Sequence, residues 1–418
     1  MEVSFRLLVG IDWATEAHQI CVIDCDRQVL RELSVKATGT GLSKLVEVLN
    51  ELSGGDPANT AVAIEVPRGP IVETLLERGF VVFAINPKQL DRFRDRHSVA
   101  GAKDDRRDAF VLADSLRTDR HLFRRVETDD PVIIQLRELS RMDDDLASEM
   151  TRLTHRLRSL LQRYYPQVLS LGSVAEDRWL WALLELAPTP EQARRLRPKR
   201  IEKLLAAHRI RRLQTSEVLA ALRSEPLTVV PGTIDATRTH LQLLLPRLRL
   251  AHQQRKECAK RIDKLLDELQ LTEGEDGEHR DVEILRSLPG VGRLVAATLL
   301  SEATRALVER DYHVLRALCG AAPVTRQSGK YTRVAMRYAC SGRLKNAIYY
   351  WAGSSVRSDP FSKLQYARFR AKGHTHARAL RGVADRLLRI LVAMLTTRSL
   401  YDPLKPHQRQ TIAQPASI

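Results

Sequence analysis

Leu7-Leu8-Val9-Gly10-Ile11-Asp12 is the stretch that decides the fold of this 418-residue chain, because it is an apolar run that ends in an acid. A second run of the same kind, Val62-Ala63-Ile64-Glu65, follows further along. A short continuous apolar run is typical of a strand buried on both faces. The sequence therefore predicts two buried strands, each closing on a carboxylate.

Two more acids stand in the segment Lys103-Asp104-Asp105-Arg106-Arg107-Asp108, which has a helical pattern. Asp105 and Asp108 are three residues apart and so share one side of a helix. Asp104 competes with Asp105 for this role, but the spacing to Asp108 favours Asp105 and leaves Asp104 as a helix cap. Together with the two strand-end acids, this helical pair is expected to bring four carboxylates to one point. Four carboxylates at one point repel one another unless cations lie between them. A pair of Mg²⁺ ions would satisfy them and would activate phosphodiester chemistry.

Each acid alone has a simpler explanation. Asp12 could be a turn or cap residue, and Asp105 and Asp108 could form a solvated helix face paired with Arg106 and Arg107. Glu65 is harder to dismiss, because an acid at the end of an apolar strand is costly unless it is paired or bound to metal. The joint order, a strand Asp, a strand Glu and a helical Asp-x-x-Asp, predicts an RNase H-like nuclease.

The remaining patterns divide the chain into domains. An α/β domain is expected over residues 1–125, since strands come first as a meander and then alternate with helices. Strands are predicted over 6–13, 18–24, 29–35, 60–66 and 80–85, and helices over 40–52, 70–78, 88–96 and 104–116.

Long helices are predicted at 130–165 and 233–271. They suggest an antiparallel coiled-coil stalk over 126–283, often a dimer element. The stalk encloses an insert of shorter helices at 166–232, to which the sequence assigns no chemistry. A mostly helical domain at 284–402 and a loose tail at 403–418 complete the chain.

The charge of the chain is concentrated near its end. The formal net charge is +16, and residues 310–418 carry 20 Lys and Arg against four Asp and Glu. A GC-rich genome explains why 53 of the 67 basic residues are Arg, but not why acids are missing after residue 310. This segment therefore predicts a polyanionic partner. Five scattered cysteines, no long apolar stretch and no signal peptide predict a cytoplasmic protein without disulfides or membrane spans.

The C-terminal domain contains two candidate sites. Leu288-Pro289-Gly290-Val291-Gly292 predicts a tight turn that opens a helix and offers backbone N–H groups to a phosphate, as in a helix-hairpin-helix motif. A plain turn between helices explains it equally well. The second is Ala322-Pro323-Val324-Thr325-Arg326-Gln327-Ser328-Gly329-Lys330, where Ser328 is a candidate nucleophile in a phosphate-rich pocket. On chemistry alone it could also be an ordinary turn serine. The candidate nucleic-acid contacts are Gly290, Gly292, Arg326, Lys330, Arg333, Arg337, Arg343 and Lys345.

These motifs, in this order, resemble a known family. Asp12, Glu65 and the 103–109 segment resemble the RuvC-like DEDD domain of a bacterial insertion-sequence transposase family, the bridge-RNA-guided serine recombinases. The turn at 288–292, Leu318-Cys319-Gly320-Ala321-Ala322-Pro323 and the Ser328 segment resemble that family's C-terminal transposase domain. The resemblance covers roughly residues 5–125 and 284–400.

The resemblance implies a function and a set of residues. Asp12, Glu65, Asp105 and Asp108 would hold Mg²⁺ near the scissile phosphate, and Ser328 would form a covalent phosphoserine link to DNA. A structured noncoding RNA would pair with donor and target DNA, and the protein would act as a dimer or tetramer. Because Asp12 and Ser328 lie on separate domains, we expect a composite site that forms when protomers assemble.

Two other functions fit parts of the pattern. A RuvC-like nuclease that hydrolyses DNA junctions with water would need the four acids but not Ser328. A non-enzymatic nucleic-acid-binding protein would keep the acids for structure alone, and four converging acids argue against it.

Overall fold

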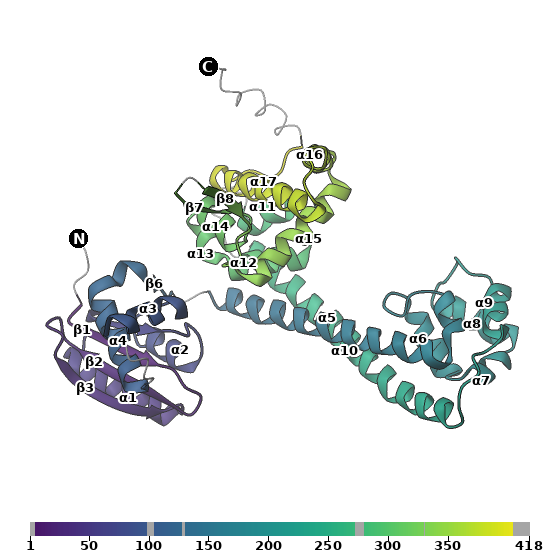
Figure 1. Ribbon diagram of the computed structural model, residues 1–418, viewed down its shortest axis with the longest axis horizontal. Coiled ribbons are helices and arrows are strands. Elements are labelled where there is room, and N and C mark those ends of the chain that lie inside the picture. Colours follow the sequence, from purple (N-terminus) through teal and green to yellow (C-terminus); the bar gives the residue numbers. More distant parts are fainter. Residues whose placement is uncertain (1–4, 98–103, 128–129, 272–279, 330, 404–418) are drawn as a thin grey trace, which may run out of the picture. The chain divides into compact units, whose positions relative to one another are not determined.

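The computed structural model describes residues 5–97, 104–127, 130–271, 280–329 and 331–403. The chain divides into two compact units, residues 1–130 and 131–418. Each is described by itself below (Figure 1).

The first unit is built on a six-stranded mixed sheet in the order β3-β2-β1-β4-β5-β6. The strands β1, β4 and β5 run parallel, while β2, β3 and β6 pair antiparallel to their neighbours. Their bounds are Leu7–Asp12, Ala17–Ile23, Val29–Lys36, Thr60–Ile64, Val81–Ala84 and Arg124–Arg125 for β1 to β6. The sequence predicted all of these strands except the short β6.

Four helices cover the two faces of this sheet. They are α1 (Gly39–Ser53), α2 (Pro70–Glu77), α3 (Pro87–His97) and α4 (Asp105–Asp119). Alternate residues of β1 point to opposite faces. Leu7, Val9 and Ile11 pack with α1 and α2, whereas Leu8 packs with α3 and α4. The predicted α/β architecture is confirmed, and the sheet order is consistent with an RNase H-like fold.

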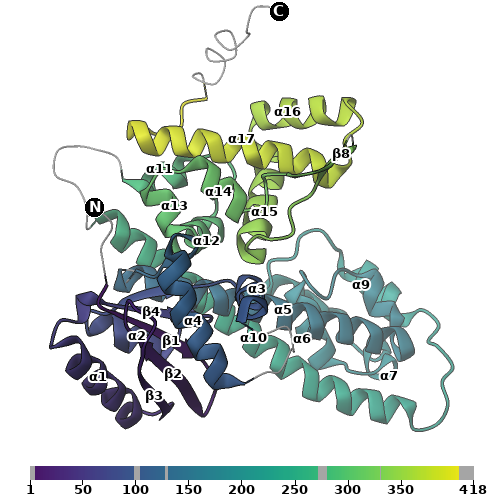
Figure 2. The same ribbon diagram turned by 60° about the vertical axis from the view of Figure 1, so that its left-hand side comes forward.

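The second unit is helical apart from one hairpin in the part of the chain described. Two long helices, α5 (Pro131–Tyr164) and α10 (Thr233–Leu271), pack against each other and lie side by side in both views (Figures 1 and 2). The start of α5 shares a hydrophobic core with the end of α10, and the end of α5 shares another with the start of α10. The pair is therefore antiparallel, as predicted.

Midway along the pair, an ion pair between a buried carboxylate and a part-exposed arginine joins the two helices. Asp143 on α5 is 2% exposed and accepts hydrogen bonds from Arg255 on α10 at 3.2–3.3 Å. The Cys258 thiol also donates to the carbonyl oxygen of Leu139. The pair favours this register of the helices, because any other register would leave the buried Asp143 carboxylate without its countercharge.

One end of the helix pair carries four short helices, which form the insert. They are α6 (Arg178–Leu186), α7 (Pro190–Arg194), α8 (Pro198–Ala207) and α9 (Thr215–Arg223). Pro190 and Pro198 occupy first helical positions, where the missing N–H has no cost. Buried Trp179, Trp181 and Tyr164 anchor the core of this end.

The other end carries the C-terminal helices and the hairpin. The helices are α11 (Asp281–Ser287), α12 (Arg293–Glu302), α13 (Thr304–Val308), α14 (Tyr312–Leu318), α15 (Gly342–Ser358), α16 (Pro360–Ala371) and α17 (His376–Thr397). The hairpin consists of β7 (Val324–Ser328) and β8 (Tyr331–Ala335). The mostly helical character is confirmed, whereas the hairpin was not foreseen. No helix in the described part of the chain is long and apolar enough to cross a membrane.

Candidate active site

The carboxyl edge of the parallel strands carries the first two acids. Ile11 of β1 and Ile64 of β4 are register partners. Asp12, the last residue of β1, and Glu65, the residue after β4, therefore come next at the same edge. Asp12 follows Leu8 in the alternation along β1, which places its side chain on the sheet face covered by α3 and α4. Both acids are half-buried.

A glycine brings α4 onto this strand. A Cβ atom on Gly10 would lie 1.9 Å from the carbonyl oxygen of Ala109 and 2.9 Å from the Cβ of Leu112. No side chain fits there, so the backbone of α4 rests directly on β1, two residues before Asp12. Asp108 immediately precedes the residue in contact.

The three acids around the start of α4 have different environments. Asp104 is the N-cap, and its carboxylate accepts a hydrogen bond from the Arg106 N–H at 3.2 Å, as predicted. Asp105 opens the helix and is exposed. Asp108 is only 2% exposed. The two acids predicted to act together therefore differ sharply in their contact with solvent.

Asp108 is held by an arginine that the sequence did not single out. Arg94 on α3 donates from Nε to one carboxylate oxygen of Asp108 at 2.7 Å and from Nη2 to the other at 2.8 Å. Its third nitrogen reaches Asp91 at 2.6 Å. A buried carboxylate needs such a countercharge. The bidentate geometry is the strongest hydrogen-bonded pairing that an arginine forms with a carboxylate.

The donor chemistry suits Mg²⁺, which prefers oxygen ligands. In the described ranges, however, no three His, Cys, Asp or Glu side chains lie close enough together to hold a metal ion. The sequence predicted four carboxylates converging on one point. The structure brings Asp12 and Glu65 to one edge but gives Asp108 to Arg94. The metal site therefore stays a prediction.

A buried histidine, His18, lies on β2, the strand that pairs with β1. Gln19 of β2 is the register partner of Asp12, and His18 precedes it. His18 is 3% exposed, and its Nδ1 accepts a hydrogen bond from the Ala14 N–H. Burial lowers the pKa of His18, because desolvation disfavours the charged ring.

Ser328 lies at the end of the exposed β7–β8 hairpin. Ser328 faces Tyr331 across the strands, and Arg326 faces Arg333. Since side chains alternate along a strand, these four residues project from one face of the hairpin. All four are exposed. The face thus combines a hydroxyl, an aromatic ring and two guanidinium groups.

The other predicted contacts are arranged differently. Arg337 donates to the Ala322 carbonyl oxygen at 3.3 Å, and Lys345 is half-buried. Lys330 lies outside the described residues. Arg343 has acidic partners: its guanidinium lies 2.9 Å from Asp144 and 3.1 Å from Glu302, and it donates to the Ser140 hydroxyl. These contacts tie α15 to α5 and α12, so Arg343 is occupied within the protein.

The turn at 288–292 packs inward on one side. Gly290 has φ +78°, and a Cβ there would lie 2.6 Å from the Ser355 nitrogen. The Pro289 carbonyl oxygen accepts hydrogen bonds from Trp351 and Ser355. Gly290 therefore allows close packing on α15, and the phosphate role predicted for the backbone of this turn stays a prediction. Gly292 is exposed at the N-terminus of α12.

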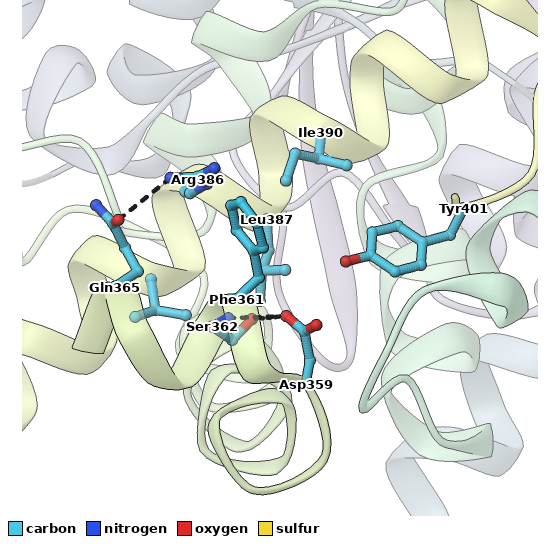
Figure 3. A pocket seen from close by; sticks show the side chains of 9 residues that line it. Asp359, Phe361, Ser362, Gln365, Arg386, Leu387, Ile390 and Tyr401 are labelled. Carbon is cyan, nitrogen blue, oxygen red and sulfur yellow. Dashed lines mark hydrogen bonds between the residues drawn. The ribbon is translucent and has the colours of Figure 1, made fainter. Parts of the chain in front are cut away.

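A small pocket lies between α16, α17 and Tyr401 (Figure 3). The Asp359 carboxylate caps α16 by accepting from the N–H and hydroxyl of Ser362 at 2.8 and 2.7 Å. Arg386 donates to Gln365 at 3.2 Å. Burial and the nearby Asp359 raise the pKa of Tyr401 to about 12. The polar groups that line the pocket bond to one another. The pocket therefore joins two helices and carries no catalytic arrangement.

Sequence reasoning missed Arg94, Gly10 and Tyr331. Arg94 stands 14 residues before Asp108, and no local spacing links them. Gly10 was visible as the one residue without a side chain in an apolar strand, which signals a close backbone approach. Tyr331 becomes a neighbour of Ser328 only once the hairpin register is known.

Comparison with known proteins defines the class of the chain. A DEDD family model described as "Transposase" matches residues 9–166. A second model, described as "Transposase IS116/IS110/IS902 family", matches residues 282–367. The chain is thus a transposase by class.

Curated relatives specify the family. The chain is 32% identical over 411 residues to the "Mini-circle putative transposase for IS117" of Streptomyces coelicolor, covering 96% of each chain. It is 50% identical to "Putative transposase y4uE" of Sinorhizobium fredii over 49% of this chain and 57% of that one. It is 32% identical to an IS110 element protein of S. coelicolor, covering 73% of each. The chain belongs to the IS110/IS116 family of insertion-sequence transposases.

Proposed function

We propose that this transposase exchanges DNA strands through a covalent phosphoserine formed by Ser328. The observation that carries the proposal is the hairpin face on which Ser328 stands beside Arg326 and Arg333. In the attack, the Ser328 oxygen loses its proton and bonds to phosphorus. The bond to a deoxyribose oxygen breaks, and that oxygen takes up a proton. A hydroxyl of another strand reverses the step, so joining needs no external energy source.

The two arginines support the serine through their charge. Like charges directly opposite in a hairpin destabilise it, and in the described residues no acid pairs with either. A phosphate between Arg326 and Arg333 would relieve this repulsion. Each guanidinium offers a fork of N–H donors suited to phosphate oxygens. The hairpin is therefore suited to hold a phosphodiester next to the Ser328 hydroxyl.

The acids of the first unit form the second part of the proposal. Asp12, Glu65, Asp105 and Asp108 would hold Mg²⁺, which when bound polarises a phosphate and stabilises the leaving oxygen. Asp12 and Glu65 share one edge of the sheet, and Gly10 brings the start of α4 to the same strand. Asp108 can take part only after it exchanges Arg94 for the ion.

Guidance by a structured noncoding RNA, and a dimer or tetramer with composite sites, complete the proposal. They rest on the resemblance in sequence and on the excess of basic residues after residue 310. Mixing Asp12→Ala protein with Ser328→Ala protein tests composite sites. Recovery of activity in the mixture supports them, and no recovery indicates sites built within one chain.

The decisive experiment looks for protein attached to DNA. Purified protein, Mg²⁺, element DNA and RNA transcribed from the flanks are incubated and separated on a denaturing gel. We expect an adduct that Ser328→Ala abolishes and Thr325→Ala retains, because Thr325 is an exposed hydroxyl on the other face of β7. Cleaved DNA with free ends, still formed by Ser328→Ala, would instead establish a hydrolytic RuvC-like nuclease.

A further inference from the structure

The exposed aromatic side chains of this protein are unevenly placed. In the described ranges, the aromatic residues with large exposed fractions are Trp13 and four tyrosines between residues 331 and 350. Tyr338 is 82% exposed, Tyr350 70% and Tyr331 66%. Tyrosines normally bury most of their ring. A group of open rings within twenty residues therefore points to a ligand that covers them.

The charge around these rings selects the kind of ligand. From Tyr312 to Ser358 the sequence contains no Asp or Glu, although it contains eight Lys and Arg. Two of these cations are paired with acids from other segments, Arg316 with Asp385 and Arg343 with Asp144 and Glu302. Arg326 and Arg333, on the hairpin face of Tyr331, have no acidic partner among the described residues. An open ring beside unpaired cations matches a nucleic-acid strand, which combines flat bases with a phosphate backbone.

The position of Tyr331 further supports a nucleic-acid strand as the ligand. It stands directly opposite Ser328 and two residues before Arg333, on the same face of the hairpin. No aromatic ring in the described part of the chain packs against Tyr331 or Tyr338. The ring of Tyr350 is met by Tyr349, with centroids 5.9 Å apart at 76°, so an edge-to-face neighbour supports it.

We infer that Tyr331 is a stacking platform for an unpaired DNA base, the one beside the phosphate that Ser328 attacks. Bases within a duplex already stack on each other and cannot cover a side-chain ring, whereas unpaired bases can. Strand exchange must expose unpaired bases at the break. The inference deepens the proposed function and rests on it for the position of the cut.

Binding of single strands tests the platform separately from the chemistry. All variants are made in a Ser328→Ala background, so that no cleavage occurs, and anisotropy is measured with a labelled mixed-sequence single strand and with its duplex. Stacking on one aromatic ring is worth about 1–3 kcal/mol, so Tyr331→Ala should weaken single-strand binding roughly five- to 150-fold. Duplex binding should change by less than about twofold, since the arginines remain.

Matched controls separate stacking from other effects. Tyr331→Phe keeps the ring and should bind single strands as the parent does. Val334→Ala removes an apolar side chain that is 64% exposed from the opposite face of β8, and it should have no effect. Tyr331→Trp should show fluorescence quenching with single strands and little with duplex.

Three results would overturn the inference. Equal losses for single strand and duplex would show that Tyr331 shapes the hairpin and does not stack on bases. An effect of Val334→Ala as large as that of Tyr331→Ala would show the same. Unchanged single-strand binding of Tyr331→Ala would show that the ring does not stack on a base, and a shift in oligomeric state with it would make the ring part of a protein interface. In protein that retains Ser328, failure of adduct formation while single-strand binding is intact would count against Ser328 chemistry and not against the platform.

Discussion

Replacing Arg94 by Gln should destabilise α4 strongly. The Asp108 side chain is 3% exposed, and Arg94 donates to both of its carboxylate oxygens, at 2.7 and 2.8 Å. Removing one partner of a buried pair costs about 3–5 kcal/mol. Because the Arg94 side chain is itself 29% exposed, we expect about 2–4 kcal/mol. The loss arises mainly from the carboxylate that is left buried without a countercharge.

Hydrogen exchange locates this loss within the full chain. Amide protection in α4 reports its local opening free energy, so 2–4 kcal/mol corresponds to protection lower by about 30- to 1000-fold. The double variant Arg94→Gln/Asp108→Asn should recover much of it, since it has no buried charge to compensate. If Arg94→Gln protects α4 as the wild type does, or if the double variant is no better than the single one, the pair does not stabilise the helix.

The Arg94→Gln variant also tests whether Asp108 is a metal ligand. With Arg94 removed, millimolar Mg²⁺ should restore protection of α4 more than it does in the wild type, because the ion can replace the lost countercharge. Asp108→Asn should abolish this response. Absence of any Mg²⁺ effect in Arg94→Gln would contradict the assignment of Asp108 to the metal site, whatever the enzyme's activity.

Further expectations concern single positions. Gly10→Ala should lower the unfolding free energy by at least about 2 kcal/mol, measured by denaturant titration, because its Cβ would meet the Ala109 carbonyl; wild-type stability would show that α4 can shift at little cost. Arg326→Ala and Arg333→Ala should each reduce the salt dependence of DNA binding by about one phosphate contact, and an unchanged slope would place them away from the backbone. His18 has a lowered pKa, so the unfolded chain binds its proton first as pH falls. Stability should therefore drop from about pH 6.5 downward, and His18→Gln should lessen that drop; identical pH profiles would mean that His18 does not contribute.

Local patterns predicted most elements of the fold. An apolar run closing on an acid fixed β1, and helical spacing fixed both ends of α10. The β7–β8 hairpin escaped prediction because most of its residues are exposed, leaving no alternation of apolar and polar positions to read. A strand without a buried face has no signature in hydrophobicity.

The candidate site was predictable only in part, for a related reason. Asp12, Glu65 and the cap Asp104 could be read because each follows from its own segment. The partners of Asp108 and Arg343 lie 14 to 203 residues away in the sequence. Gly290 likewise meets Ser355 across a long separation. Roles decided by such distant neighbours require the folded chain.

The length of the antiparallel pair of α5 and α10 sets the distance between the two ends of the second unit. With 34 residues at 1.5 Å each, α5 spans about 50 Å, close to the length of about 15 base pairs of duplex. The hairpin with Ser328 and the small helices α6 to α9 belong to opposite ends of this span. One residue added to each of the two helices would lengthen the pair by about 1.5 Å and turn one end by about 100° relative to the other. Seven residues added to both helices would nearly restore the phase, while two would place the ends on different sides of the axis. The chain can therefore change the surface of these helices freely but can change their length only in steps.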